Sequence, residues 1–169
     1  TICAGAPSAA INFTSNQVGT VFAWTTTNQV IGIASSGTGN IAPFTAVNAG
    51  TAPISSTVVA TPTLTTNGQG CAGATVSALI TVNPNPVMTS PASASFCQGS
   101  TVAYNFTNNI PNGVVYAWNN SNTAIGLGAS GNGNISFQAQ NGTSAPISGT
   151  VSVIPTYTSN GVSCAGASQ

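Results

Sequence analysis

The sequence predicts an all-β fold made of tandem antiparallel β-sandwiches, and three observations lead to this prediction. Thr, Ser, Asn, Gly and Val dominate the 169 residues, together with ten prolines, a composition typical of strands and turns rather than long helices. Short segments with alternating apolar and polar residues are separated by clusters of turn-forming residues. The third observation is that the chain repeats itself once.

The two copies are offset by about 94 residues, which is close to a common domain size and far above the period of stacked solenoid repeats. The phrase IGIASSGTGNI in the first copy returns as IGLGASGNGNI in the second. Three pairs of segments match: 11–24 with 104–118, 31–41 with 125–135, and 44–73 with 137–166. We therefore expect two domains, residues 1–84 and 85–169. About seven short strands in each favour an immunoglobulin-like (PKD-like) sandwich.

One segment has apolar residues at four alternate positions, Val76, Ala78, Ile80 and Val82. This alternation predicts a half-buried strand. Each copy also has a single tryptophan, Trp24 or Trp118, between apolar residues of a strand. We expect these two residues to be the core aromatics of the sandwiches. A sugar-stacking platform is the alternative role, and the apolar flanks favour the core.

The repeated phrase is predicted to contain turns, at SSGTGN (35–40) and SGNGN (130–134). Gly supplies the positive φ that tight turns need, and Asn tolerates it. A phosphate-cradling loop is the alternative interpretation. Such a loop opens a helix and uses a Lys, and neither feature follows the phrase.

The chain contains no Lys, Arg, Asp, Glu or His. General acid–base catalysis needs groups of these types, so we expect no catalytic residue and no enzyme activity. Calcium and magnesium sites need carboxylates, and the four cysteines lack the close C-x-x-C pairs of zinc sites, so no metal or cofactor is expected. Nucleic acids and anionic membranes are bound through Lys and Arg clusters, and no apolar run reaches the length of a membrane-spanning helix. We expect neither partner.

The cysteines occupy equivalent positions in the two copies, Cys3 with Cys97 and Cys71 with Cys164. A domain of this size buries a limited core, so a covalent staple is plausible. Closing a loop of roughly 70 residues stabilises a fold by about 4 kcal/mol in the chain-entropy model. We predict the bridges Cys3–Cys71 and Cys97–Cys164, and with them an oxidising, extracytoplasmic setting. Buried free thiols are the alternative, because sequence does not prove a pairing.

The stretch VNPNPVMTSPA (82–92) predicts a stiff, extended junction, because proline fixes φ and removes amide donors. No counterpart of the strand at 74–83 follows Cys164, and no counterpart of 87–94 precedes Thr1. We expect a window cut from a longer array whose second module lacks its last strand. A strand donated by a neighbouring chain is the alternative. No signal peptide is visible at Thr1, which suggests a mature segment.

Several segments together resemble a known kind of surface protein: CAGAPSAAINFTSN, VFAWTTTN, NAGTAPIS with its counterpart NGTSAPIS, and TVNPNP. They are similar to the repeat modules of the giant cell-surface adhesins of gliding Bacteroidetes, the SprB-like proteins with tandem PKD-like or immunoglobulin-like domains. The resemblance covers essentially the whole chain. It implies an exported filament at the cell surface, carried by the gliding machinery and secreted by the type IX route. The acidic Asp-Gly turn of PKD domains is replaced after each tryptophan by TTTN and NNSN.

Three functions are weighed on these grounds. The favoured one is a structural and adhesive segment of an extracellular filament or stalk, with neighbouring modules, filament subunits or surface glycans as partners. A lectin-like module is the alternative, for which Tyr104, Tyr116 and Tyr157 would have to form a sugar platform. Ice binding fits the Thr- and Ser-rich composition, but a period of about 94 residues does not supply closely spaced ranks of Thr.

A neutral surface promotes association unless something else solvates it. The chain contains five N-x-[ST] sequons, at Asn12, Asn105, Asn119, Asn134 and Asn141. We regard these as candidate glycosylation sites, with O-linked sugars on Ser or Thr as the alternative. Assembly into filaments is the other arrangement that is compatible with an uncharged, association-prone surface.

Overall fold

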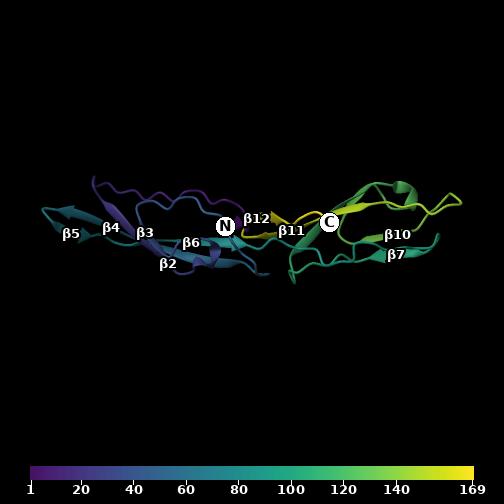
Figure 1. Ribbon diagram of the computed structural model, residues 1–169, viewed down its shortest axis with the longest axis horizontal. Helices are drawn as coiled ribbons and strands as arrows, with labels where there is room; N and C mark the ends of the chain where they lie inside the picture. The colour runs from purple at the N-terminus through teal and green to yellow at the C-terminus, as the bar shows by residue number, and fades with distance from the viewer. The chain divides into compact units, whose positions relative to one another are not determined.

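The computed structural model describes all 169 residues and shows several β-sheets (Figure 1). The only helical segments are two short 3-10 turns, η1 (Gln29–Ile31) and η2 (Thr123–Ile125). The all-β prediction is therefore confirmed, and the sheets are consistent with a β-sandwich. The chain divides into two compact units, Thr1–Pro84 and Asn85–Gln169.

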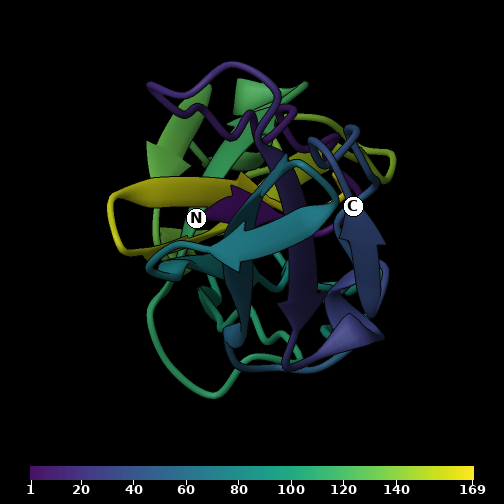
Figure 2. The same ribbon diagram turned by 90° about the vertical axis from the view of Figure 1, so that its left-hand side faces the viewer.

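The first unit contains one large sheet, drawn in purple to teal in Figures 1 and 2, with the strand order β1-β6-β4-β2-β3. Strand β1 is parallel to β6, the other neighbours are antiparallel, and β5 pairs with the end of β4. The strands are β1 (Ile2–Cys3), β2 (Val21–Thr26), β3 (Ser36–Thr38), β4 (Ile54–Thr66), β5 (Gln69–Ala72) and β6 (Val76–Asn83).

The second layer of this unit is a pair of extended segments joined by the isolated bridges Pro7–Thr45 and Ile11–Ile41. Backbone hydrogen bonds run in both directions between Ile11 and Ile41, at 3.0 and 2.9 Å. Apolar side chains of both layers meet between them, which removes them from water and stabilises the unit. The buried core consists of Trp24, Ile31, Ile33, Ile41, Ala46, Val58, Ala60 and Val82.

The second unit has a sheet of order β12-β11-β8-β9 and a two-stranded sheet β10-β7. In the latter, Ile135 pairs with Tyr104 as Ile41 pairs with Ile11 in the first unit. The strands are β7 (Thr101–Tyr104), β8 (Val114–Asn120), β9 (Ser130–Asn132), β10 (Ile135–Gln138), β11 (Val151–Ser159) and β12 (Val162–Ala165). The main core cluster is Phe106, Trp118, Leu127, Ile135 and Val153.

The predicted half-buried strand exists as β6, but its burial changes along its length. Val82 is fully buried, whereas Val76 is 54% exposed and Ala78 is also exposed. The reason lies in the neighbours of β6: β4 pairs with its whole length, but β1 pairs only with Val82 and Asn83. The first half of β6 is therefore a sheet edge, and the prediction of half-burial is wrong there.

The repeated glycine-rich phrase is not simply a turn. Its central residues form the short strands β3 and β9, with Gly37 directly opposite Trp24 and Gly131 opposite Trp118. A Cβ on Gly37 would lie 2.4 Å from Cζ2 of Trp24, and one on Gly131 would lie 2.3 Å from Cζ2 of Trp118. Each indole ring therefore lies against a glycine backbone, and any side chain there would displace the ring.

A second glycine of the phrase meets two constraints at once. Gly32 and Gly126 end the 3-10 turns with φ of 93° and 96°, a conformation that side chains disfavour. An added Cβ on Gly32 would also lie 2.2 Å from the carbonyl oxygen of Thr45, and one on Gly126 would be equally close to that of Gln138. The expected positive φ of the turn falls on Gly39 and Gly133, both at 72°.

Substituting Gly37→Ala should lower the free energy of unfolding of the first unit by about 1–3 kcal/mol, because the new methyl group overpacks the Trp24 ring. Urea unfolding followed by tryptophan fluorescence measures this change. Gly70→Ala is the matched control, since a Cβ there meets nothing closer than 3.5 Å. Equal stability of the two variants would contradict the tryptophan–glycine packing.

Candidate functional site

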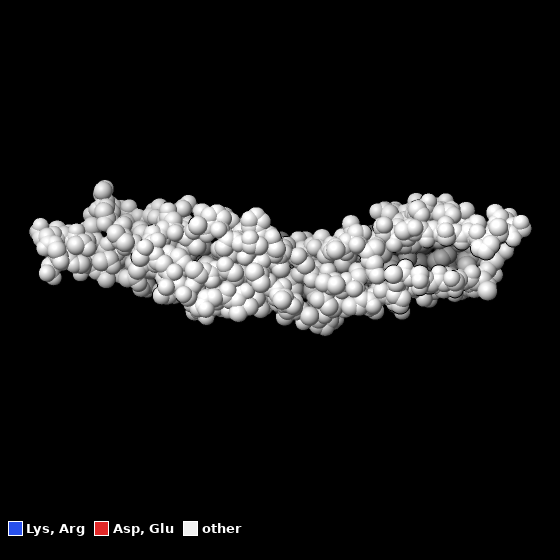
Figure 3. Space-filling view, in the orientation of Figure 1, with Lys and Arg blue, Asp and Glu red and all other residues white.

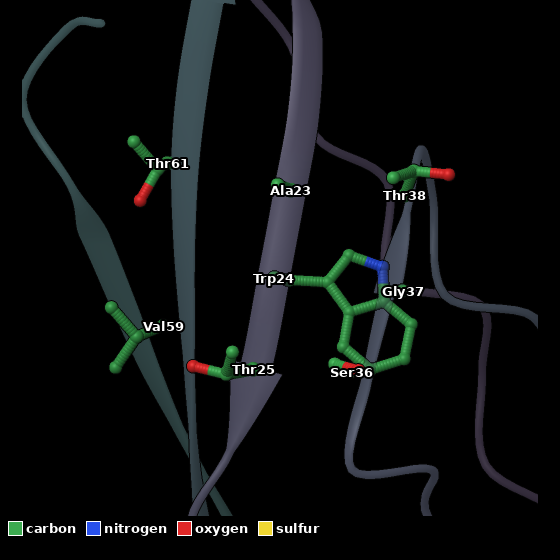
Figure 4. Close-up of a pocket in the computed structure, with 8 residues that line it drawn as sticks. All are labelled: Ala23, Trp24, Thr25, Ser36, Gly37, Thr38, Val59 and Thr61. Atoms are coloured by element: carbon green, nitrogen blue, oxygen red, sulfur yellow. The ribbon is translucent and has the colours of Figure 1, made fainter.

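The outer face of the first unit carries a shallow pocket over β2, β3 and β4. Figure 4 shows the residues that line it, with the Trp24 indole extended over Gly37 and threonine side chains on either side. The lining consists of Ala23, Trp24, Thr25, Ser36, Gly37, Thr38, Val59 and Thr61. Hydroxyl groups thus surround a patch of strand backbone, while the Trp24 ring itself is buried in the core.

Strand pairing sets the spacing of this pocket. Ala23 pairs with Thr38 on one side and Thr61 on the other, and Thr25 likewise pairs with Ser36 and Val59. Directly opposed residues have their Cβ atoms about 4.5–5.5 Å apart, so the hydroxyls form two short rows across three strands. Thr25, Ser36 and Thr38 are exposed.

The second unit presents the same rows with different side chains. Ala117 pairs with Asn132 and Ile154, and Asn119 pairs with Ser130 and Ser152. Three hydroxyl side chains of the first unit thus have other counterparts in the second. Thr25 and Thr38 correspond to the amides Asn119 and Asn132, and Thr61 corresponds to the apolar Ile154. Hydroxyl and amide groups both donate and accept hydrogen bonds, so either face offers neutral polar groups to a ligand.

This face carries no charged side chain, and neither does the rest of the protein. The formal net charge is zero because Lys, Arg, Asp and Glu are all absent, and the space-filling view in Figure 3 accordingly has no coloured atom. No group of three His, Cys, Asp or Glu side chains is positioned to hold a metal ion. Any recognition at these rows rests on neutral hydrogen bonds and van der Waals contact.

Trp24 and Trp118 lie in the cores of the two units, 7% and 8% exposed. The indole Nε1 of each is buried and has no hydrogen-bond acceptor within the protein. A buried polar group without a partner costs on the order of 1–3 kcal/mol. The shape of the ring against Gly37 or Gly131, rather than its N–H group, therefore accounts for its stabilising role.

The three tyrosines considered for a sugar platform are all half-buried. Tyr104 and Tyr116 pack against the core of the second unit and flank Phe106, with ring centroids 5.6 and 5.4 Å from it. The Tyr104 hydroxyl donates to the carbonyl of Pro91, and the amide of Asn108 donates to the Tyr116 hydroxyl at 2.6 Å. Both rings are therefore held in place by packing and by hydrogen bonds.

The cysteine pairing predicted from the sequence is wrong. Cys71 and Cys97 are free and exposed, whereas Cys3 and Cys164 are disulfide-bonded. Each predicted bridge, Cys3–Cys71 and Cys97–Cys164, requires one of the two free cysteines, so neither is formed. Equivalent positions in a repeat share a local environment, but that does not specify which sulfur atoms meet.

The candidate glycosylation asparagines differ in their surroundings. Four of them are exposed: Asn12, Asn105, Asn119 and Asn134. Asn141 is half-buried, and its Nδ2 donates to the carbonyl of Ala145 at 2.9 Å while its Oδ1 accepts from the N–H of Thr143. A glycan on Asn141 would therefore disturb the loop around it, whereas the other four positions are accessible.

Sequence reasoning missed the structural role of several asparagines. The Oδ1 of Asn40 accepts from the N–H of Phe13 at 2.9 Å, and that of Asn134 accepts from the N–H of Phe106 at 3.0 Å. Asn28 and Asn122 cap the 3-10 turns in the same manner. Their recurrence at the repeat offset was the available signal. These side-chain amides accept hydrogen bonds from backbone N–H groups. In other proteins, Asp, Ser and Thr side chains also fill this role.

No known protein family model, curated protein or solved structure matches this chain. No helix in the structure has the length and apolar character needed to cross a membrane.

Two thiols per chain should react with a disulfide reagent such as dithionitrobenzoate under native conditions, because Cys71 and Cys97 are exposed and free. Denaturation without reduction should reveal no further thiol. The Cys71→Ser and Cys97→Ser variants should each lose one reactive group. A native count of zero would instead support the pairing that the sequence suggested.

The free energy of unfolding should stay constant between about pH 5 and pH 7, because stability changes with pH only where folded and unfolded chains bind different numbers of protons. The chain has no Asp, Glu, His or Lys side chain to titrate in or near this range. Urea midpoints measured at several pH values provide the test. A loss of stability on acidification would contradict the account.

Proposed function

We propose that this chain is a structural and adhesive repeat segment of an extracellular surface filament or stalk. The observation that carries the proposal is the contrast between the inside and the outside of the two units. The tryptophan–glycine contact and the asparagine caps recur in both, while residues facing outward from the same strands differ, as Thr25 and Asn119 do. A constant framework with a variable outer face suits a module used for extension and contact.

We also propose that each unit is an immunoglobulin-like, PKD-like sandwich. Support comes from the strand order of the first unit, since β6, β4, β2 and β3 follow one another as the G, F, C and C′ strands of variable-type immunoglobulin sheets do. Trp24 on β2 then takes the place of the tryptophan on strand C. Strand β1, parallel to β6, adds a short edge to the same sheet.

The partners that fit this proposal are neighbouring repeat modules or filament subunits, and surfaces rich in neutral hydrogen-bonding groups, such as glycans. Rows of hydroxyls and amides with no net charge would form many weak contacts that salt does not screen. The resemblance to adhesin repeats of gliding Bacteroidetes supports an exported, cell-surface location. It also extends the proposal to gliding motility.

The adhesive part of the proposal is tested on beads coated with the chain and detached from glycan-bearing or glass surfaces by flow. Replacing the exposed hydroxyls, as Thr25→Val with Ser36→Ala and Thr38→Val, should lower the flow needed for detachment at least twofold, because these side chains supply the contacts. Thr65→Val with Thr66→Val is the control, since both residues are exposed at the far end of β4. Raised salt should leave attachment unchanged.

Equal detachment of both variants would exclude the hydroxyl rows as the adhesive face. Antibodies against the chain, applied to intact cells that produce it, test the location. Surface labelling is expected, and label confined to permeabilised cells would contradict a filament or stalk outside the cell.

A further inference from the structure

Five asparagines are followed directly by a glycine, at positions 67, 112, 132, 141 and 160. In such a pair the backbone nitrogen of the glycine can attack the side-chain Cγ of the asparagine, because glycine has no Cβ to obstruct the approach. The reaction requires rotation of the asparagine backbone, a side chain that is free to turn, and water at the site. These requirements distinguish the five pairs, although all five share one sequence motif.

Two of the pairs form the tips of tight hairpins. Asn67 and Asn160 have φ of 52° and 49°, and the glycine after each is also at positive φ. The residues that flank each tip are paired across the hairpin, as Thr66 is with Gln69. Rotation of either asparagine would break the pair that closes its hairpin, so the folded hairpin opposes the reaction.

Two further pairs are held by hydrogen bonds. The N–H of Gly133, whose nitrogen would have to attack Asn132, donates to the carbonyl of Tyr116 at 2.9 Å. The Asn141 side chain donates to the carbonyl of Ala145 at 2.9 Å and accepts from a backbone N–H of the same loop. Each of these pairs has a reacting group engaged, and its reaction first requires local opening of the structure.

The fifth pair, Asn112 with Gly113, lies in the loop before β8. The first part of this loop is anchored, because Ile110 is 4% exposed and its N–H donates to a side-chain oxygen of the same loop at 2.7 Å. Residues 111–113 are all exposed and belong to no strand. The Asn112 side chain makes no hydrogen bond, and the pairing of β8 begins only at Val114. This pair therefore meets all three requirements.

The counterpart loop of the first unit lacks both the motif and the freedom. Its glycine, Gly19, follows Val18 rather than an asparagine. The hydroxyl of Thr20 donates to the carbonyl of Gln17 at 2.9 Å and lies 3.1 Å from the hydroxyl of Ser15. The exposed asparagine–glycine loop is thus a feature of the second unit alone.

We propose that Asn112 is a site of spontaneous deamidation in the folded protein. The nitrogen of Gly113 bonds to Cγ of Asn112, the glycine proton and the side-chain amino group leave as ammonia, and a five-membered succinimide results. Water then opens the ring at one of its two carbonyls and leaves aspartate or isoaspartate at position 112. This inference goes beyond the proposed function and does not depend on adhesion.

The product carries a charged side chain in a protein that otherwise has none. Position 112 lies just before Val114, which together with Val115 and Asn132 lines a shallow pocket over the start of β8. A carboxylate beside this pocket makes contacts with the surface sensitive to salt. A net charge away from zero also opposes association between chains. The age of the chain thereby sets the charge of the second unit.

Incubation of the purified, folded chain at neutral pH over several weeks tests the proposal. The intact mass should rise by about one unit, and an acidic form should appear on anion exchange. Peptide mapping should find roughly tenfold more aspartate and isoaspartate at position 112 than at any of the other four positions, because the fold restrains those four. Asn112→Gln is the matched variant and should lose the acidic form, since its longer side chain would have to close a larger, less favoured ring.

Incubation in guanidinium chloride separates the effect of the fold from that of the motif. In the unfolded chain the five pairs should react at similar rates, because no hairpin or hydrogen bond then restrains them. The proposal is overturned if the folded chain stays unmodified while the unfolded chain reacts, or if another position reacts faster than 112 in the folded chain. A preference for position 112 that persists after unfolding, or an unchanged acidic form in Asn112→Gln, would overturn it as well.

Discussion

The packing of one tryptophan ring against one glycine backbone is the contact on which each unit depends. Trp24 stands on the central part of the sheet with Gly37 opposite it, and Trp118 and Gly131 repeat the arrangement. The glycine lets the edge strand approach so closely that the ring fills the space a side chain would take. The Trp24 ring belongs to the same core cluster as Ile31 of η1 and Val58 and Ala60 of β4. Replacing the tryptophan by a smaller residue, or the glycine by a larger one, would separate the edge strand from the core.

Neutral polar groups take over the tasks that charges perform in most proteins. Asparagine amides hold extended segments to the strands beside them, as Asn40 does for Phe13, and cap the 3-10 turns, as Asn28 does. Amide and hydroxyl groups keep their hydrogen-bonding capacity at any pH and ionic strength. A surface made of them offers neutral hydrogen bonds rather than ion pairs.

The sequence predicted the strand-rich class and the position of the tryptophans, because alternation and repetition are local properties that survive folding. It did not predict β3, because Ser36 and Gly37 belong to a glycine-rich phrase with low strand propensity. That strand exists because Trp24 needs a glycine beside it, which is a tertiary requirement. The cysteine pairing was also missed, since Cys71 and Cys97 are free. The partner of a cysteine depends on distance in space, which sequence spacing does not encode.

The sequence predicted the chemical character of the outer face but not the arrangement of its side chains. Composition indicated a neutral, hydroxyl-rich surface, but the rows that join Thr25 with Ser36 depend on strand register.

Proton NMR of the chain tests the central claim most directly, because an indole ring shifts the resonances of protons that lie over its face. The account predicts two glycines, Gly37 and Gly131, with Hα resonances shifted strongly upfield and with nuclear Overhauser contacts to the tryptophan Hζ2 protons. Glycine Hα resonances at ordinary positions, without contacts to either indole, would contradict it.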